Sequence, residues 1–148
     1  MIQILDLKNY DVFAELDLTE LGLLAKIAQA VNGVEGEVLI QAGLPARTLY
    51  VLREGNLMVA FPDGRAITLH RPGEVVGWSA FVSPASYTAS VICLTDSTLI
   101  AFPGRELLRL AQINAATGTK IMRKISQVVS KRLPYISEED RRRLQGAR

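Results

Sequence analysis

The chain has few of the residues on which disulfide and metal chemistry depend. Among 148 residues there is one cysteine, Cys93, and one histidine, His70. A single cysteine cannot form an internal disulfide, and a single histidine cannot form a histidine-rich metal site. We therefore predict no disulfide and no metal centre.

Recognisable catalytic motifs are lacking as well. Neither His70 nor Cys93 has a base or an orienting partner nearby in the sequence, as a nucleophile would need. The sequence contains no Walker-type glycine loop and no paired-carboxylate motif. We predict a non-enzymatic protein in which Cys93 is a small buried hydrophobic residue and His70 is a surface or hydrogen-bonded structural residue.

Long hydrophobic runs are also missing. No stretch of about 18 or more consecutive apolar residues occurs, so no membrane-spanning helix is predicted. The segment Met1–Leu7 has neither the basic start nor the apolar centre of a secretory signal. We expect a cytoplasmic protein without a membrane partner.

Charge is distributed unevenly along a chain of otherwise ordinary composition, with 49% hydrophobic and 22% charged residues. Residues 1–119 carry 8 basic and 12 acidic side chains, whereas residues 120–148 carry 9 basic and 3 acidic ones. The acidic body excludes a uniform nucleic-acid-binding surface. The length is that of one domain.

The first part of the chain has helical spacing. Apolar residues recur at helical intervals: Leu16, Leu21, Leu24, Ile27 and Ala28. Thr19, ahead of Glu20, is the predicted N-cap. Gly33 and Gly36 mark the end of this region.

Short runs rich in β-branched and aromatic residues follow between Glu37 and Phe102, and they predict strands. These runs are residues 38–40, 49–52, 57–61, 66–69, 90–93 and 98–102. Asp63-Gly64 is the strongest hairpin signal and predicts a two-residue type I′ turn. Strands this short and this evenly spaced favour an antiparallel sandwich or barrel.

Helical spacing returns after Pro103-Gly104 and predicts a long C-terminal helix at about residues 115–133. Its apolar stripe consists of Ile121, Ile125, Val128, Val129 and Leu133. Pro134 ends it, and residues 134–148 are predicted to form a short basic tail helix that begins near Ser137.

A glycine-led segment, residues 73–81, is followed by Tyr87 and residues 88–91. A glycine followed by small residues can begin a short helix whose free backbone N–H groups bind an anion. The alternative is a plain turn inside a β domain. Small side chains at Ala80 and Ala89 would let a ligand approach the backbone closely.

The order of these features resembles the cyclic nucleotide-binding domain family over about residues 12–133. Residues 36–40, Gly43, 50–52 and Gly55 resemble the glycine and apolar framework of its first strands, and residues 73–81 and 88–91 resemble its phosphate-binding cassette. The resemblance implies a mainly β fold over residues 1–133, an antiparallel jelly roll with an N-terminal helix and a long C-terminal helix. The ligand-binding residues that it implies are Gly77, Trp78, Ser79, Ala80, Phe81, Tyr87, Thr88 and Ala89.

Two positions depart from the family pattern. Trp78 stands where nucleotide-binding members have a glutamate that bonds the ribose, and Tyr87 stands where they have an arginine that neutralises the phosphate. Losing a hydrogen bond to a charged group costs about 1.5–3 kcal/mol, and losing one side of a desolvated charge pair costs about 2–5 kcal/mol. We expect cAMP binding to be weak or absent, with Trp78 either packing in the pocket or stacking on a base.

The resulting hypothesis is a regulatory or ligand-sensing module without a resident cofactor. Its ligand would be a cyclic nucleotide or another small anion, and its partner another regulatory protein. The alternative is a protein–protein interaction scaffold whose own side chains fill the pocket.

Two further expectations concern the C-terminal part. The helix stripe can fold back on its own domain, or it can form a homodimer seam as in transcription factors of this family. We favour the homodimer, through Ile121, Ile125, Val128 and Val129. The sequence ends at Arg148 without a helix-turn-helix, and residues 141–143 are too few to replace one. We therefore expect no direct DNA binding.

Overall fold

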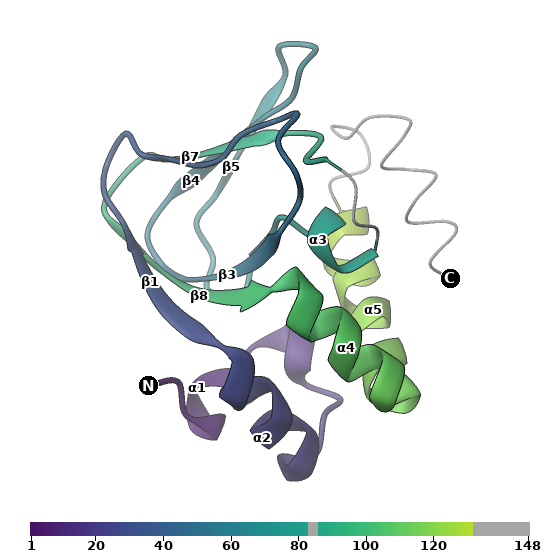
Figure 1. Cartoon of the computed structure of the whole chain (residues 1–148). Coiled ribbons are helices and arrows are strands. Elements are labelled where there is room, and N and C mark those ends of the chain that lie inside the picture. Colours follow the sequence, from purple (N-terminus) through teal and green to yellow (C-terminus); the bar gives the residue numbers. More distant parts are fainter. Residues whose placement is uncertain (83–85, 132–148) are drawn as a thin grey trace.

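Two antiparallel sheets of four strands each form the body of the structure, a computed structural model that describes residues 1–82 and 86–131 (Figure 1). The strand order is β1-β8-β3-β6 in one sheet and β2-β7-β4-β5 in the other. The strands are β1 Gln29–Gly33, β2 Val38–Ile40, β3 Thr48–Glu54, β4 Leu57–Ala60, β5 Ala66–Leu69, β6 Val75–Val76, β7 Ser90–Cys93 and β8 Ser97–Pro103. The predicted mainly β jelly roll is confirmed.

Helices from both ends of the sequence, together with the short helix α3 from its middle, gather at one end of the sheets (Figure 1). They are α1 Ile4–Lys8, the short 3₁₀ helix η1 Asp11–Phe13, α2 Leu18–Ile27, α3 Ser79–Val82, α4 Gly104–Ile113 and α5 Ala115–Ser130. The predicted N-terminal and C-terminal helices are therefore present. Lys131 lies in a turn, and the tail predicted for residues 134–148 lies outside the described residues.

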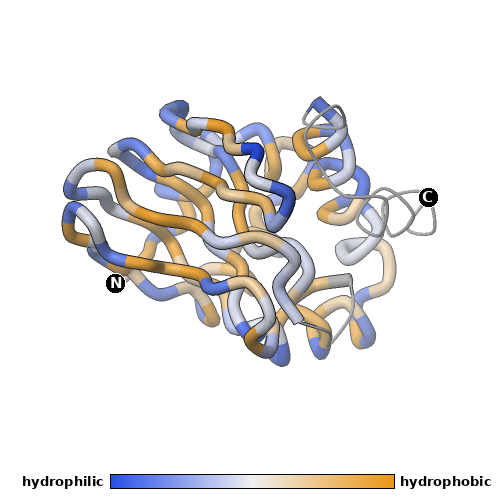
Figure 2. The backbone as a smooth tube through the Cα atoms, turned by 90° about the horizontal axis from the view of Figure 1, so that it is seen from above, coloured by the Kyte–Doolittle hydropathy of each residue, from blue (hydrophilic) through white to orange (hydrophobic). Residues whose placement is uncertain are grey.

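The core lies between the two sheets and continues under the helices. Along β4, Leu57 and Val59 are buried, whereas Met58 and Ala60 are half-buried. This alternation is typical of a strand with one inner face. Hydrophobic residues run along the strands and hydrophilic ones occupy the loops between them (Figure 2). Phe13 of η1 meets Phe102 of β8 edge to face at 5.6 Å, so the N-terminal helices are anchored on the sheet.

Two strands were missed by the sequence patterns. β1 contains only one β-branched residue, Val31, yet it pairs with β8 along its full length, from Gln29 opposite Ala101 to Gly33 opposite Ser97. β6 is two residues long and pairs with Tyr50 and Val51 of β3. In both cases the pairing partner fixes the strand, because long-range hydrogen bonds override weak local preference.

The hairpin at Asp63-Gly64 is present, but the predicted turn type is wrong. A type I′ turn needs positive φ at both residues, and among the described residues only glycines have it. Instead, Gly64 alone is left-handed, with φ +93°, and its N–H donates to the carbonyl of Phe61 at 3.0 Å. The loop has three residues, because the N–H of Phe61 pairs with the carbonyl of Arg65 at 2.8 Å.

The N-cap of α2 is Asp17 and not Thr19, which was the predicted cap. The Asp17 carboxylate accepts from the N–H of Glu20 at 2.8 Å, and the Glu20 carboxylate accepts from the N–H of Asp17 at 3.0 Å. This reciprocal capping box satisfies two backbone donors at once. A cap at Thr19 would leave both of them to solvent.

Candidate functional site

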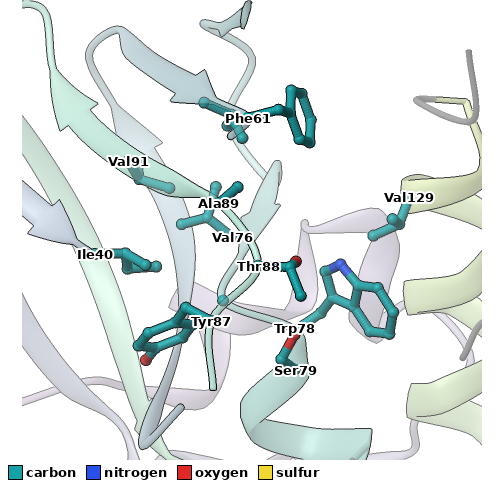
Figure 3. A pocket seen from close by; sticks show the side chains of 12 residues that line it. Ile40, Phe61, Val76, Trp78, Ser79, Tyr87, Thr88, Ala89, Val91 and Val129 are labelled. Atoms are coloured by element: carbon teal, nitrogen blue, oxygen red, sulfur yellow. The ribbon is translucent and has the colours of Figure 1, made fainter. Parts of the chain in front are cut away.

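A pocket lies between the sheet of β2, β4 and β7, the β6–α3 turn and α5 (Figure 3). Its lining comprises Ile40, Val59, Phe61, Val76, Gly77, Trp78, Ser79, Tyr87, Thr88, Ala89, Val91 and Val129. The space between these residues is about 460 Å³ including the open mouth, but only about 40 Å³ admits the centre of a water molecule. Little of this space is therefore wide enough for a water molecule.

Gly77 forms the turn that brings the next residues into the pocket. Its φ is +76°, and a Cβ at this position would lie 2.5 Å from the carbonyl oxygen of Thr48 and 3.0 Å from the Ile40 side chain. Only glycine fits both the left-handed backbone and the crowded space. The N–H of Ala80 then donates to the Gly77 carbonyl at 3.0 Å, and α3 begins.

Trp78 fills the side of the pocket next to α5. Its side chain is only 6% exposed, and its indole ring points toward α5, where Val129 lies beside it (Figure 3). The position that would carry a ribose-binding carboxylate in the family pattern therefore holds a bulky packing side chain. Of the two interpretations of Trp78, this geometry favours packing.

The hydroxyl of Tyr87 connects the pocket wall to β3 by hydrogen bonds. The hydroxyl donates to the Thr48 carbonyl at 2.6 Å and accepts from the Thr48 N–H at 2.9 Å. Burial raises the pKa of Tyr87, so the phenol stays neutral at physiological pH. The residue at the phosphate-neutralising position therefore supplies no charge, and its hydroxyl is already engaged.

No acidic or basic side chain lines the pocket among the residues that the structure describes. The segment that follows α3, residues 83–85, reads Ser-Pro-Ala and is also uncharged. The hydroxyls of Ser79 and Thr88 are the polar side chains in addition to Tyr87 and the Trp78 indole, and both residues take part in other interactions. An anion would meet no opposite charge from these residues.

The structure brings six of the eight predicted ligand-binding residues to this pocket: Gly77, Trp78, Ser79, Tyr87, Thr88 and Ala89. Ala80 and Phe81 do not line it, and their part in ligand binding stays a prediction. Ala80 is 2% exposed and packs against Gly104, where a Cβ would lie 2.7 Å from its carbonyl oxygen. Phe81 is 5% exposed and belongs to the hydrophobic core.

The apolar part of the lining was not predicted as site residues. It consists of Ile40, Val59, Phe61, Val76, Val91 and Val129. Strand periodicity predicts that those of these residues that lie on strands face inward. The same alternation is expected whether an inward residue lines a pocket or fills the core. No sequence signal separates the two roles.

The predicted dimer seam is mostly buried within the chain. Ile121, Ile125 and Val129 are 2%, 1% and 1% exposed, whereas Val128 is half-buried. The stripe thus packs on its own domain, one of the two alternatives, and a seam through Ile121, Ile125 and Val129 would require α5 to leave that position. The homodimer itself stays a prediction.

The two residues considered for catalysis differ in exposure, since Cys93 is buried and His70 is not. Burial raises the pKa of the Cys93 thiol, and the carboxylates of Glu37 and Asp96 raise it further, so the nucleophilic thiolate is disfavoured. His70 is exposed. Within residues 1–82 and 86–131 there is no group of three or more metal-binding side chains, nor a helix long and apolar enough to cross a membrane.

The jelly roll, the glycine-led turn and the pocket that they enclose define a ligand-binding β domain. The family model described as the cyclic nucleotide-binding domain matches residues 32–114, more than half of the chain. The chain belongs to the cyclic nucleotide-binding domain family.

Solved and curated proteins agree with this assignment. A protein of Geobacter metallireducens GS-15 named for cyclic nucleotide binding is similar with TM-score 0.83 and 26% identity, covering 90% of this chain and 99% of that one. The N-terminal domain of a transcriptional regulator from Streptomyces coelicolor A3(2) has TM-score 0.66 and 26% identity, covering 93% and 99%. Glutaminase 2 of Bradyrhizobium diazoefficiens is 26% identical over 122 residues, which are 82% of this chain and 19% of that protein. This chain thus spans about a fifth of that relative's length.

Proposed function

We propose that this chain is a non-enzymatic regulatory module that senses a small molecule and binds cAMP weakly or not at all. This proposal rests on the side chains at the two positions that bind the ribose and the phosphate in the family pattern. Trp78 is packed beside Val129, and the hydroxyl of Tyr87 is bound to the backbone of Thr48. Neither residue offers a charge to a nucleotide.

The size of the effect follows from the interactions that are missing. A lost hydrogen bond to a charged group and a lost desolvated charge pair together amount to roughly 3–8 kcal/mol. This corresponds to a factor of about 10² to 10⁶ in affinity. A site of about micromolar affinity would weaken to about 0.1 mM or beyond on this scale.

The pocket offers a direct route from ligand to partner surface. Val129 of α5 lines the pocket next to the Trp78 indole, so a ligand that moves the indole also changes the contact with α5. The other end of α5 is attached to the N-terminal segment by Lys120–Glu20 and Arg123–Glu15 ion pairs, each at 2.9 Å. Ligand occupancy would shift α5 against this segment and so alter a surface for a second regulatory protein or a second copy.

The relatives support a regulatory role. One similar structure is a domain of a transcriptional regulator, and the similarity to a glutaminase covers only 19% of that enzyme. Both are consistent with a domain that accompanies other activities and carries none of its own.

Calorimetric titration with cAMP and with cGMP tests the loss of nucleotide affinity. We expect no binding tighter than about 0.1 mM and little change in the thermal-unfolding midpoint in the presence of either nucleotide. A ligand at about 100 times its dissociation constant adds roughly 2.7 kcal/mol of stability. Micromolar binding with such a stabilisation would contradict the proposal.

The scaffold alternative is favoured by one observation, the small free volume of about 40 Å³ left beside the buried indole. The two functions differ in the effect of Ala89→Leu, which fills the remaining space. In a sensor this variant abolishes ligand binding and alters partner binding together. In a scaffold, partner binding continues and there is no ligand response to lose.

A further inference from the structure

The pocket contains a buried hydrogen-bond donor, the indole N–H of Trp78. Trp78 is only 6% exposed, and within residues 1–82 and 86–131 no group accepts a hydrogen bond from this N–H. Figure 3 shows the indole nitrogen on the edge of the ring that faces the pocket. Buried donors are nearly always paired in folded proteins, so this one is available to an acceptor that enters the pocket.

The surroundings of this donor determine what kind of acceptor fits. The lining is largely apolar and includes Val59, Phe61 and Val91, and no charged side chain lines the pocket among the described residues. Burying an anion without an opposite charge is costly, whereas a neutral carbonyl oxygen needs only the one donor. The site therefore matches an uncharged molecule with an apolar body.

The free space limits the size of the ligand. About 40 Å³ admits the centre of a water molecule, and one bound water needs roughly 10–15 Å³ by this measure. A molecule of a few non-hydrogen atoms fits without displacing Trp78 or Val129. A larger one has to push the indole toward α5.

We propose that the Trp78 pocket binds a small, uncharged carbonyl compound whose oxygen accepts the indole N–H and whose apolar groups contact Val59, Phe61 and Val91. This inference rests on the proposed sensing function and specifies its ligand class. It replaces the anionic ligand expected from the sequence. It also gives Trp78 two roles, since the same ring binds the ligand and contacts the helix that carries the response.

Acetone and acetate test this inference, because they have nearly the same shape and differ in charge. Trp78 is the only tryptophan, so ¹⁵N-labelled protein gives a single indole N–H signal in an NMR spectrum. We expect acetone to move this signal saturably, and acetate to bind at least about tenfold more weakly, the ratio that corresponds to about 1.4 kcal/mol. An indole signal that acetone leaves unchanged, as when only water occupies the pocket, overturns the inference, and so does tighter binding of acetate.

Trp78→Phe is the variant that removes the donor and keeps an aromatic ring. It should abolish the rise in thermal-unfolding midpoint that acetone produces. Tyr10→Phe is the matched control, since it removes one polar atom from a ring that does not line the pocket, and it should keep that rise. Equal responses of the two variants contradict the role of the indole N–H, and the wild-type titration decides the question if Trp78→Phe fails to fold.

A cAMP titration of the same sample separates this inference from the proposed function. Absence of both acetone and cAMP binding defeats the ligand class but leaves the predicted loss of nucleotide affinity intact. Micromolar cAMP binding that moves the indole signal defeats both.

Discussion

At the residue scale, Glu20 is the most strongly perturbed acid in the described part of the chain for which a pKa value is resolved. Its carboxylate accepts hydrogen bonds from the Thr117 hydroxyl and, at 2.9 Å, from the Lys120 ammonium. The Thr117 bond and then the Asp17 N–H lower the pKa from 4.5 to about 2, against the opposing effect of burial. One side chain thereby caps α2 and joins it to the first turns of α5.

The lowered pKa of Glu20 predicts a stability that is lost in acid. Because the folded-state pKa lies below the unfolded one, the contribution is complete above about pH 4.5 and declines as the pH falls toward about 2. Glu20→Gln should lower the free energy of unfolding by about 1.5–3 kcal/mol at neutral pH. The difference from wild type should shrink between these two pH values. Urea denaturation at several pH values measures both effects.

Glu15→Gln is the control for Glu20→Gln. Glu15 pairs with Arg123 at 2.9 Å, but the two side chains are 34% and 54% exposed. An exposed ion pair contributes about 0–1 kcal/mol. If the two variants cost the same, burial of Glu20 is not what makes it important.

At the scale of elements, the turn between β6 and α3 is constrained both by its backbone conformation and by the packing around it. Gly77 is left-handed and crowded by the Thr48 carbonyl, whereas Gly36 is left-handed, with φ +87°, and has no atom within 4 Å of a Cβ. A comparison of the two positions therefore isolates crowding from backbone conformation.

Gly77→Ala should be markedly more destabilising than Gly36→Ala. The left-handed conformation alone costs roughly 1–2 kcal/mol for a residue with a Cβ, which is the expected cost at Gly36. At Gly77 the clash with Thr48 adds to this and forces α3 and Trp78 to move. Thermal and urea unfolding of both variants gives the comparison, and equal losses would show that Gly77 is needed only for its φ.

Sequence patterns located elements well where local preference and tertiary structure agree. The β-branched runs of β3 and β8 and the stripe of α5 are such cases. β1 was missed because its residues have little strand preference and are held by β8. The cap of α2 moved from Thr19 to Asp17 because Glu20 completes a reciprocal pair only with Asp17. The N-cap preference of a single residue does not take such a pair of hydrogen bonds into account.

At the scale of the whole molecule, the pocket depends on contacts between parts of the chain that are distant in sequence. Family resemblance pointed to the β6–α3 turn and residues 87–89, which the structure brings to one pocket. It did not identify Val129, because the contact between α5 and the pocket depends on how α5 packs on the domain. That packing is set by Ile121 and Ile125, which are 2% and 1% exposed. The same stripe predicted a dimer seam, because a helix face has the same apolar spacing whether its own domain or a second chain covers it.

If two side chains account for the loss of nucleotide affinity, then restoring both should restore it. Trp78→Glu combined with Tyr87→Arg returns the carboxylate and the cation of the family pattern to the pocket, and it removes the indole that fills it. We expect cAMP affinity to rise by at least about 10²-fold over wild type, the lower end of the calculated loss, as measured by calorimetry. Trp78→Gln with Tyr87→Gln opens the same space without adding charge. Equal cAMP affinity in the two double variants would mean that pocket volume, and not charge, excludes the nucleotide.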